Sequence, residues 1–180
     1  DPCGGSAHLL TTLGFLHGER IQSLLCSDIR SDAVKIANYN LDLLSSIGIK
    51  NRASTLRKLI KLYDKPSHYD ALNSAISLSN SLSLDAIKTQ AFVADALTQS
   101  IARSSVDLLI TDVPYNNLVI WDSNVTDPIS HLLDKQYNTL RKGAVVAITT
   151  LKSQKISHER YEHLKHITVG KRRISFLRPR

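Results

Sequence analysis

The chain has 180 residues, of which 42% are hydrophobic, and no run of residues approaches 18 uncharged apolar positions. This length allows one substantial core, and no membrane-spanning helix is predicted. The net charge of +7 favours a polyanionic partner. The two cysteines, Cys3 and Cys26, do not make a disulfide framework and suit a reducing cytosol. No Cys or His spacing is typical of a metal site. We therefore expect a cytoplasmic monomer that needs neither metal nor membrane.

The first half of the chain predicts four helices and one strand. Helical periodicity covers residues 6–17 and 31–46, and a strand pattern covers 21–28 between them. Two more helices are expected near 52–63 and 67–82, inside an insertion at about residues 50–88. The insertion interrupts an otherwise regular alternation of strands and helices.

The second half is richer in strands. Strands are predicted at 92–95 and 106–112, with a short helix through 101 between them, and an irregular loop follows at 116–126. A helix at 129–141 leads through a glycine to a strand at 144–149, and a basic helix at 158–165 precedes a hairpin of 166–169 and 173–177. The alternation predicts an α/β fold with a parallel sheet, helices on both faces and a terminal antiparallel hairpin, in a single domain over residues 1–180.

A glycine-bearing turn opens the chain, in the sequence Asp1-Pro2-Cys3-Gly4-Gly5-Ser6. Glycines allow the backbone to approach a ligand closely, and the following helix, which Ser6 could cap, adds its N–H groups. Asp28 ends the second strand pattern, at the spacing where nucleotide-binding α/β folds bind ribose hydroxyls. Alternatively, the first feature is a plain tight turn and Asp28 is an acid at the start of a helix.

Two later acidic positions complete the pattern. Asp95 follows the apolar residues 91–94, and Asp112-Val113-Pro114-Tyr115 follows the buried strand at 106–112. The latter turn resembles the catalytic loop of S-adenosylmethionine-dependent methyltransferases that modify a planar amine. Asp112 can accept a hydrogen bond from an amino group, and Tyr115 offers a flat face for stacking a base. Pro114 lacks an N–H, which leaves nearby carbonyls to face the substrate. Alternatively, the Asp112 turn is an ordinary loop start, and Asp95 is a loop acid or a helix cap.

Taken together, these residues make the chain resemble the avilamycin-resistance type of 23S ribosomal RNA guanine methyltransferase. The resemblance rests on residues 1–6, 9–11, 27–28, 37–41, 65–67 and 111–115 and on Trp121. Three positions depart from the family pattern. Ala7 stands where the family prefers a third glycine, His8 where it prefers an aromatic residue, and Asn116 where it prefers a glycine. The resemblance implies a Rossmann-like class I methyltransferase fold and a role in antibiotic resistance. Its first strand would immediately precede Asp1, so we expect an N-terminally truncated domain with a slot through its sheet.

The resemblance implies a role for each of these positions. S-adenosylmethionine would lie against the glycine turn, with Asp28 on its ribose and Asp95 facing its adenine. The cofactor-binding residues would be Asp1, Cys3, Gly4, Gly5, Asp28 and Asp95, and the catalytic residues would be Asp112, Pro114 and Tyr115. Trp121 would line the entrance for the target base, which must leave its stack to react; equally, it could pack under the loop.

Positive charge is concentrated in two segments. Residues 50–66 carry six basic side chains and one acidic one, and residues 141–180 carry eleven and two. Such patches are typical of phosphate-backbone binding; the alternative is a solvated basic surface. The predicted RNA-binding residues are Lys50, Arg52, Arg57, Lys58, Lys61, Lys65, Trp121, Lys152, Lys155, Lys171 and Arg172.

The sequence therefore predicts an S-adenosylmethionine-dependent methyltransferase that modifies a guanine of large-subunit ribosomal RNA. Two alternatives remain at this stage. One is an N-methyltransferase acting on DNA or on a protein amide, because the same turn serves those substrates. The other is a catalytically idle RNA-binding module of the same fold, which would not bind S-adenosylmethionine.

Overall fold

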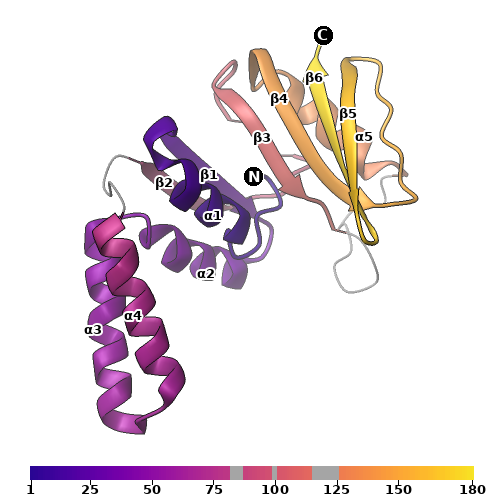
Figure 1. The fold of residues 1–180 in the computed structure, drawn as a ribbon. Helices are drawn as coiled ribbons and strands as arrows, with labels where there is room; N and C mark the ends of the chain where they lie inside the picture. Colours follow the sequence, from indigo (N-terminus) through magenta and orange to yellow (C-terminus); the bar gives the residue numbers. More distant parts are fainter. Residues whose placement is uncertain (82–86, 99–100, 115–125) are drawn as a thin grey trace. The chain divides into compact units, whose positions relative to one another are not determined.

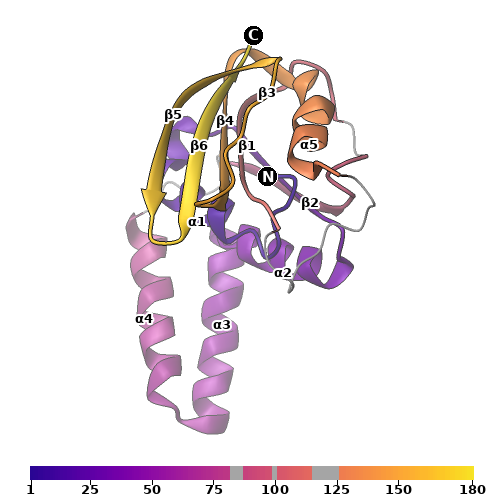
Figure 2. The same cartoon turned by 90° about the vertical axis from the view of Figure 1, so that its right-hand side faces the viewer.

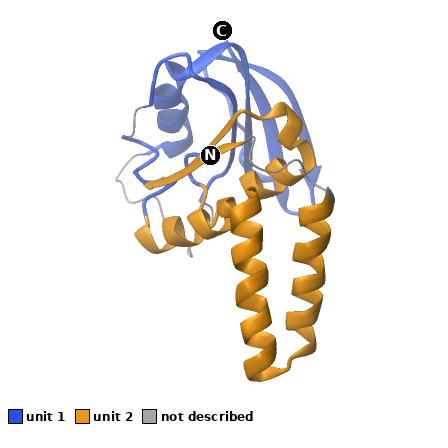
Figure 3. Cartoon of the chain, turned by 90° about the vertical axis from the view of Figure 1, so that its left-hand side faces the viewer, with its two compact units in different colours: residues 1–3, 27–29, 93–180 blue, residues 4–26, 30–92 orange. Residues whose placement is uncertain are grey.

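The computed structural model describes residues 1–81, 87–98, 101–114 and 126–180 (Figure 1). These residues form two compact units, which Figure 3 shows in different colours. Unit 1 contains Asp1–Cys3, Ser27–Ile29 and the chain from Val93 onward, and unit 2 contains the remainder. The single-domain organisation stays a prediction.

Unit 1 is built on a four-stranded sheet in the order β3-β4-β6-β5. Strand β3 (Val106–Asp112) pairs in parallel with β4 (Leu140–Leu151), whereas β6 (Arg172–Pro179) runs antiparallel to both β4 and β5 (Tyr161–Val169). The terminal hairpin is thus antiparallel, as predicted, and β6 lies between β4 and the edge strand β5. Strand β3 has the predicted bounds, but it is only partly buried, because only Leu109 and Thr111 within it are shielded from solvent.

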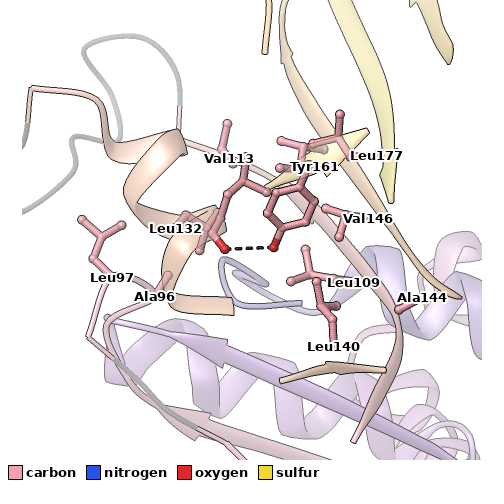
Figure 4. Close-up of a cluster of buried hydrophobic side chains, with 12 residues drawn as sticks. Ala96, Leu97, Leu109, Val113, Leu132, Leu140, Ala144, Val146, Tyr161 and Leu177 are labelled. Atoms are coloured by element: carbon pink, nitrogen blue, oxygen red, sulfur yellow. Dashed lines mark hydrogen bonds between the residues drawn. The ribbon is translucent and has the colours of Figure 1, made fainter. Parts of the chain in front are cut away.

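Helix α5 (Pro128–Tyr137) packs its apolar face on the sheet of unit 1. The core combines Leu132 and Leu133 of the helix with buried side chains of the strands (Figure 4). Within it, the Tyr161 hydroxyl donates a hydrogen bond of 2.9 Å to the Leu133 carbonyl. The Asp127 side chain caps the helix by accepting from Ser130 N–H at 3.1 Å, and the proline at its first position suits that start.

The other sheet has two strands, β1 (Ser23–Asp28) and β2 (Lys88–Val93). Lys88 N–H donates to the Gln22 carbonyl and Ala94 N–H donates to the Asp28 carbonyl, so the two strands are parallel. Unit 2 also contains α1 (His8–His17), a 3-10 turn (Gly18–Arg20) and α2 (Ser31–Asp42). The last residues of β1 and β2 belong to unit 1.

The predicted insertion is a helical hairpin of α3 (Ser46–Tyr63) and α4 (Pro66–Ser81), which lie side by side in Figures 1 and 2. It begins earlier than predicted, because the Ser45 hydroxyl accepts from Gly48 N–H at 3.0 Å and starts a new helix there. Consequently the helix expected at 31–46 ends at Asp42. No helix within the described part of the chain is long and apolar enough to cross a membrane.

Four other sequence-based boundaries are wrong. The strand expected at 92–95 runs from Lys88 to Val93, and Ala96–Thr98 form a turn instead of a helix. Strand β4 begins before Gly143, whose φ of +84° falls where the β3–β4 register shifts, so this glycine makes a bulge rather than a loop. The helix expected at 158–165 is absent, and Tyr161–Val169 pair with β6. Cross-strand pairing overrides the local helical pattern there.

Candidate active site

Three aspartates of unit 1 follow the carboxyl ends of strands. Asp28 ends β1, Asp112 ends β3, and Asp95 comes two residues after β2. All three side chains are partly buried. Because open α/β sheets bind ligands outside the carboxyl ends of their parallel strands, these positions mark the candidate site.

The first three residues are fastened to the end of β1. Ser27 N–H donates to the Asp1 carbonyl at 2.9 Å, and the Ser27 hydroxyl donates to the Pro2 carbonyl at 3.3 Å. The Asp1 carboxylate in turn accepts from Cys3 N–H at 3.0 Å. These contacts hold the predicted cofactor-binding residues Asp1 and Cys3 beside the strand that carries Asp28.

Cys3 is influenced by two of the three acidic positions. Burial raises the pKa of its thiol from 9.0 to about 12, the Thr111 side chain lowers the pKa, and the charges of Asp28 and Asp95 raise it. The negative charges of both carboxylates therefore favour the neutral thiol. The thiol stays neutral at physiological pH, so Cys3 provides an uncharged apolar surface and does not act as a nucleophile. It also packs against the hydrophobic core of unit 1.

Asp95 shapes the turn that follows β2. Its carboxylate accepts from Leu97 N–H at 2.9 Å, and its carbonyl accepts from Thr98 N–H at 3.1 Å. The first contact is the Asx turn that aspartate commonly forms. Asp95 therefore stabilises its own loop, as the alternative interpretation of the sequence expected. The turn in return holds the Asp95 carboxylate in place.

Asp112 is paired with Arg172, a contact that sequence reasoning missed. Arg172 Nη1 lies 3.3 Å from Asp112 Oδ2. Asp112 is in register with Thr149 of β4, and Thr149 is in register with Ile174 of β6. Arg172 lies two residues before Ile174, so its side chain extends from the same face of the sheet. No local signal could have revealed a pair separated by 60 residues.

The second half of the glycine turn, from Gly4 onward, belongs to unit 2, and the backbone is left-handed at two positions there. Gly5 has φ +52° and Ala7 has φ +59°, and Ala7 N–H closes the turn on the Gly4 carbonyl at 2.7 Å. The fully buried Ala7 stands where the resembled family prefers glycine, and left-handed backbone costs an L-residue about 1–2 kcal/mol. Ala7 rather than Ser6 is the N-cap of α1 and has no side-chain cap, so the capping role predicted for Ser6 is wrong. Instead, the Asn40 side chain donates to the Ser6 carbonyl at 2.8 Å.

The predicted RNA-binding residues that the structure describes are all exposed and fall into two groups. The first group is on α3 and in the turn after it, and consists of Lys50, Arg52, Arg57, Lys58, Lys61 and Lys65. The second is in unit 1, and consists of Lys152, Lys155, Lys171 and Arg172. Lys152 N–H donates to the Lys171 carbonyl at 2.9 Å, which joins the end of β4 to the β5–β6 turn.

Two predicted site residues, Tyr115 and Trp121, lie outside the described residues. Pro114 is described and is partly buried, and Val113 before it is in the core of unit 1. The candidate turn is thus anchored on one side by an apolar side chain. Among the described residues there is no group of three or more His, Cys, Asp or Glu side chains that could hold a metal ion.

Comparisons with known proteins agree with this arrangement. The family model described as "rRNA methyltransferase AviRa" matches residues 1–172. A 23S rRNA (guanine(2535)-N(1))-methyltransferase of Streptomyces viridochromogenes is 32% identical, over 99% of this chain and 74% of its own length.

Solved structures give the same result. The structure of the rRNA methyltransferase aviRa from Streptomyces viridochromogenes superposes with a TM-score of 0.85 at 30% identity, and covers 99% of this chain and 74% of that chain. A conserved hypothetical protein of Streptococcus pyogenes has a TM-score of 0.51 at 14% identity, over 98% of this chain and 82% of its own, which is a likeness of fold alone. The predicted family and the methyltransferase fold are confirmed.

Proposed function

Since the chain belongs to the AviRa family of rRNA methyltransferases, we propose that it transfers a methyl group from S-adenosylmethionine to a guanine base of large-subunit ribosomal RNA. The observation that carries this proposal is the position of Asp112. It is the last residue of β3, and the Arg172 guanidinium group lies 3.3 Å from its carboxylate. The target would be a guanine, as in the printed name of the relative from Streptomyces viridochromogenes.

The residues around the strand ends fit the proposed cofactor. S-adenosylmethionine carries its methyl group on a sulfonium, already activated for transfer. The Asp28 carboxylate is suited to accept hydrogen bonds from the ribose hydroxyls, and Asp95 faces the adenine in the arrangement that the resemblance implies. Cys3 supplies an uncharged surface next to both carboxylates.

The protein itself would align the target nitrogen with the methyl group and accept the hydrogen bond of that nitrogen. Asp112 accepts the hydrogen bond of the target nitrogen, which directs the nitrogen lone pair to the methyl group. Arg172 keeps the Asp112 carboxylate oriented before the base arrives. Tyr115 stacks on the flipped base, and Pro114 shapes the turn without adding an N–H.

RNA affinity would come from the exposed basic residues of α3 and of the ends of β4 and β6, because lysine and arginine displace counterions from phosphates. Trp121 would line the base entrance. We further propose that the protein acts as a cytoplasmic monomer, which its two free cysteines suit. The relatives give no support to DNA or a protein amide as the substrate. A catalytically idle RNA-binding module would not need the Asp112–Arg172 pair.

The test is methyl transfer from radiolabelled S-adenosylmethionine to large-subunit ribosomal RNA, with the modified position mapped by primer extension. Asp112→Ala should lower turnover by about 10²- to 10⁴-fold, as expected for loss of a positioned proton acceptor. Asp107→Ala is the matched control, because Asp107 lies on the same strand and pairs with Arg141 at 3.0 Å. Tyr115→Phe should be milder than Tyr115→Ala. Full methyl transfer by Asp112→Ala would remove Asp112 from catalysis.

A further inference from the structure

The turn before α1 contains an L-residue in a backbone conformation that L-residues rarely adopt. Ala7 has φ +59° and ψ +24° and is 0% exposed. In left-handed backbone the Cβ of alanine comes close to the following carbonyl oxygen, which glycine avoids because it has no Cβ. Such a conformation persists only where the surrounding structure holds it. The contacts of this turn, and not the preference of Ala7, must therefore set its shape.

The peptide group between Ser6 and Ala7 is hydrogen-bonded at both of its ends. Its N–H, that of Ala7, donates to the Gly4 carbonyl at 2.7 Å, and its carbonyl, that of Ser6, accepts from the Asn40 side chain at 2.8 Å. Thr11 N–H donates to the Ala7 carbonyl, so the Ser6 carbonyl precedes the hydrogen-bond ladder of α1. A peptide group rotates as one plane, so these two bonds together restrict the φ of Ala7.

Asn40 reaches this peptide group from the last turn of α2. It lies three residues after the fully buried Ala37, on the same side of the helix, and is itself partly buried. Within unit 2, α1 and α2 are in contact (Figure 1). Leu44, just after α2, fills the space that a side chain at Gly14 of α1 would need. The amide donor and the turn are therefore held by two helices that pack on each other.

A second asparagine of α2 provides a comparison. The Asn38 side chain donates to the Val34 carbonyl of its own helix at 3.1 Å and lies 3.5 Å from the Ala91 carbonyl of β2. It is exposed, and two residues along a helix correspond to about 200° of rotation, so it points away from Asn40. Asn38 thus has the same side chain on the same helix without contacting the glycine turn.

We propose that Asn40 is a positioning residue for the cofactor, because its hydrogen bond to Ser6 holds the glycine turn in the shape that binds S-adenosylmethionine before the cofactor arrives. This inference rests on the proposed function for the identity of the ligand. It explains how this chain keeps an alanine where the resembled family prefers a glycine. Asn40 acts through the turn and not on the reacting atoms, so its loss should lower cofactor affinity and leave kcat at saturating cofactor unchanged.

The experiment measures S-adenosylmethionine binding to the full chain by calorimetry, together with KM for the cofactor and kcat. Asn40→Ala should weaken binding by about 2- to 10-fold, the effect of one neutral hydrogen bond, and raise KM without changing kcat. Asn40→Asp keeps the size of the side chain but turns a carboxylate oxygen toward the Ser6 carbonyl, so its loss should be at least as large. Asn38→Asp adds the same charge to the same helix and should bind like the parent.

A second substitution tests whether Asn40 acts through Ala7. Glycine adopts left-handed backbone without a steric cost, so in an Ala7→Gly background Asn40→Ala should change cofactor affinity by less than about twofold. Hydrogen exchange of the Ala7 amide reports the same turn in the absence of cofactor. This exchange should be faster in Asn40→Ala than in the parent or in Asn38→Asp, because the turn opens more often.

Three outcomes would overturn the inference. The first is parental cofactor affinity of Asn40→Ala, and the second is an equal loss with alanine and with glycine at position 7. The third is a lower kcat with an unchanged KM, which would mean that Asn40 only sustains the fold. If the parent binds no S-adenosylmethionine, the proposed function is refuted, and the exchange of the Ala7 amide then shows by itself whether Asn40 holds the turn. Unchanged exchange in Asn40→Ala overturns the inference whatever the parent binds.

Discussion

The strand-end site and the α3–α4 hairpin are built in opposite ways. Asp112 meets Arg172 across 60 residues of chain, and Ser27 meets Pro2 across 25. In the hairpin, the Tyr69–Asp64 hydrogen bond spans five residues, and the capping contact of Ser45 spans three. The site is partly buried and acidic, whereas the outer surface of the hairpin is exposed and basic.

This difference separates two tasks of an RNA-modifying enzyme. Chemistry needs groups held in a defined geometry, which only tertiary contacts between distant segments provide. Binding of the RNA backbone needs positive charge on an accessible surface, which one helix provides by itself. Substitutions in the two regions should therefore change different measured quantities: RNA affinity for the hairpin, and cofactor affinity or kcat for the strand-end site.

The largest effect should come from the hairpin. Replacing Arg57, Lys58 and Lys61 together with glutamine should weaken RNA binding by about a hundredfold near physiological salt, because three phosphate contacts are lost. The slope of log K against log salt should become less steep by roughly 0.7–0.9 for each contact. Affinity for S-adenosylmethionine should not change, as calorimetry would show. A salt slope identical to that of the parent would mean that the hairpin does not contact phosphates.

The second effect concerns the cofactor. Asp28→Ala should weaken S-adenosylmethionine binding by about 1.5–3 kcal/mol, the usual size of a lost charged hydrogen bond. Asp28→Asn should restore part of it, because an amide oxygen still accepts a hydrogen bond. Isothermal titration measures both variants, and Asp32→Ala, exposed in the first turn of α2, is the control. Unchanged cofactor affinity in Asp28→Ala would remove Asp28 from the site.

The smallest effect separates two roles for neighbouring cations. Arg172→Gln should lower kcat by about fivefold, because the pair with Asp112 is partly exposed and such pairs contribute about 1 kcal/mol or less. Lys171→Gln, one residue away and exposed, should instead raise KM for RNA and reduce the salt slope. Arg172→Lys should recover part of kcat. If Arg172→Gln changes only KM and the salt slope, then Arg172 is a phosphate contact and does not orient Asp112.

Sequence patterns predicted those parts of the fold whose signals are local. Most residues before Asp112 are apolar, and β3 has the predicted bounds. The two helices of the insertion were found, although α3 starts at Ser46 because a serine cap acts there. Where a segment is short and polar the pattern failed, since residues 158–165 have a helical composition yet Tyr161–Val169 form an edge strand. Charged side chains are common on edge strands, which face solvent.

By itself the sequence determined the family, the order of the acidic residues along the chain and the concentration of basic residues in two segments, because each depends only on which residues follow one another. The tertiary structure decided the rest. It paired Arg172 with Asp112, exposed the buried Cys3 thiol to the charges of Asp28 and Asp95, and gave Ala7 its left-handed backbone. These are contacts between segments that are distant in sequence, or backbone geometry imposed by packing. Their energies depend on three-dimensional register, which no local spacing encodes.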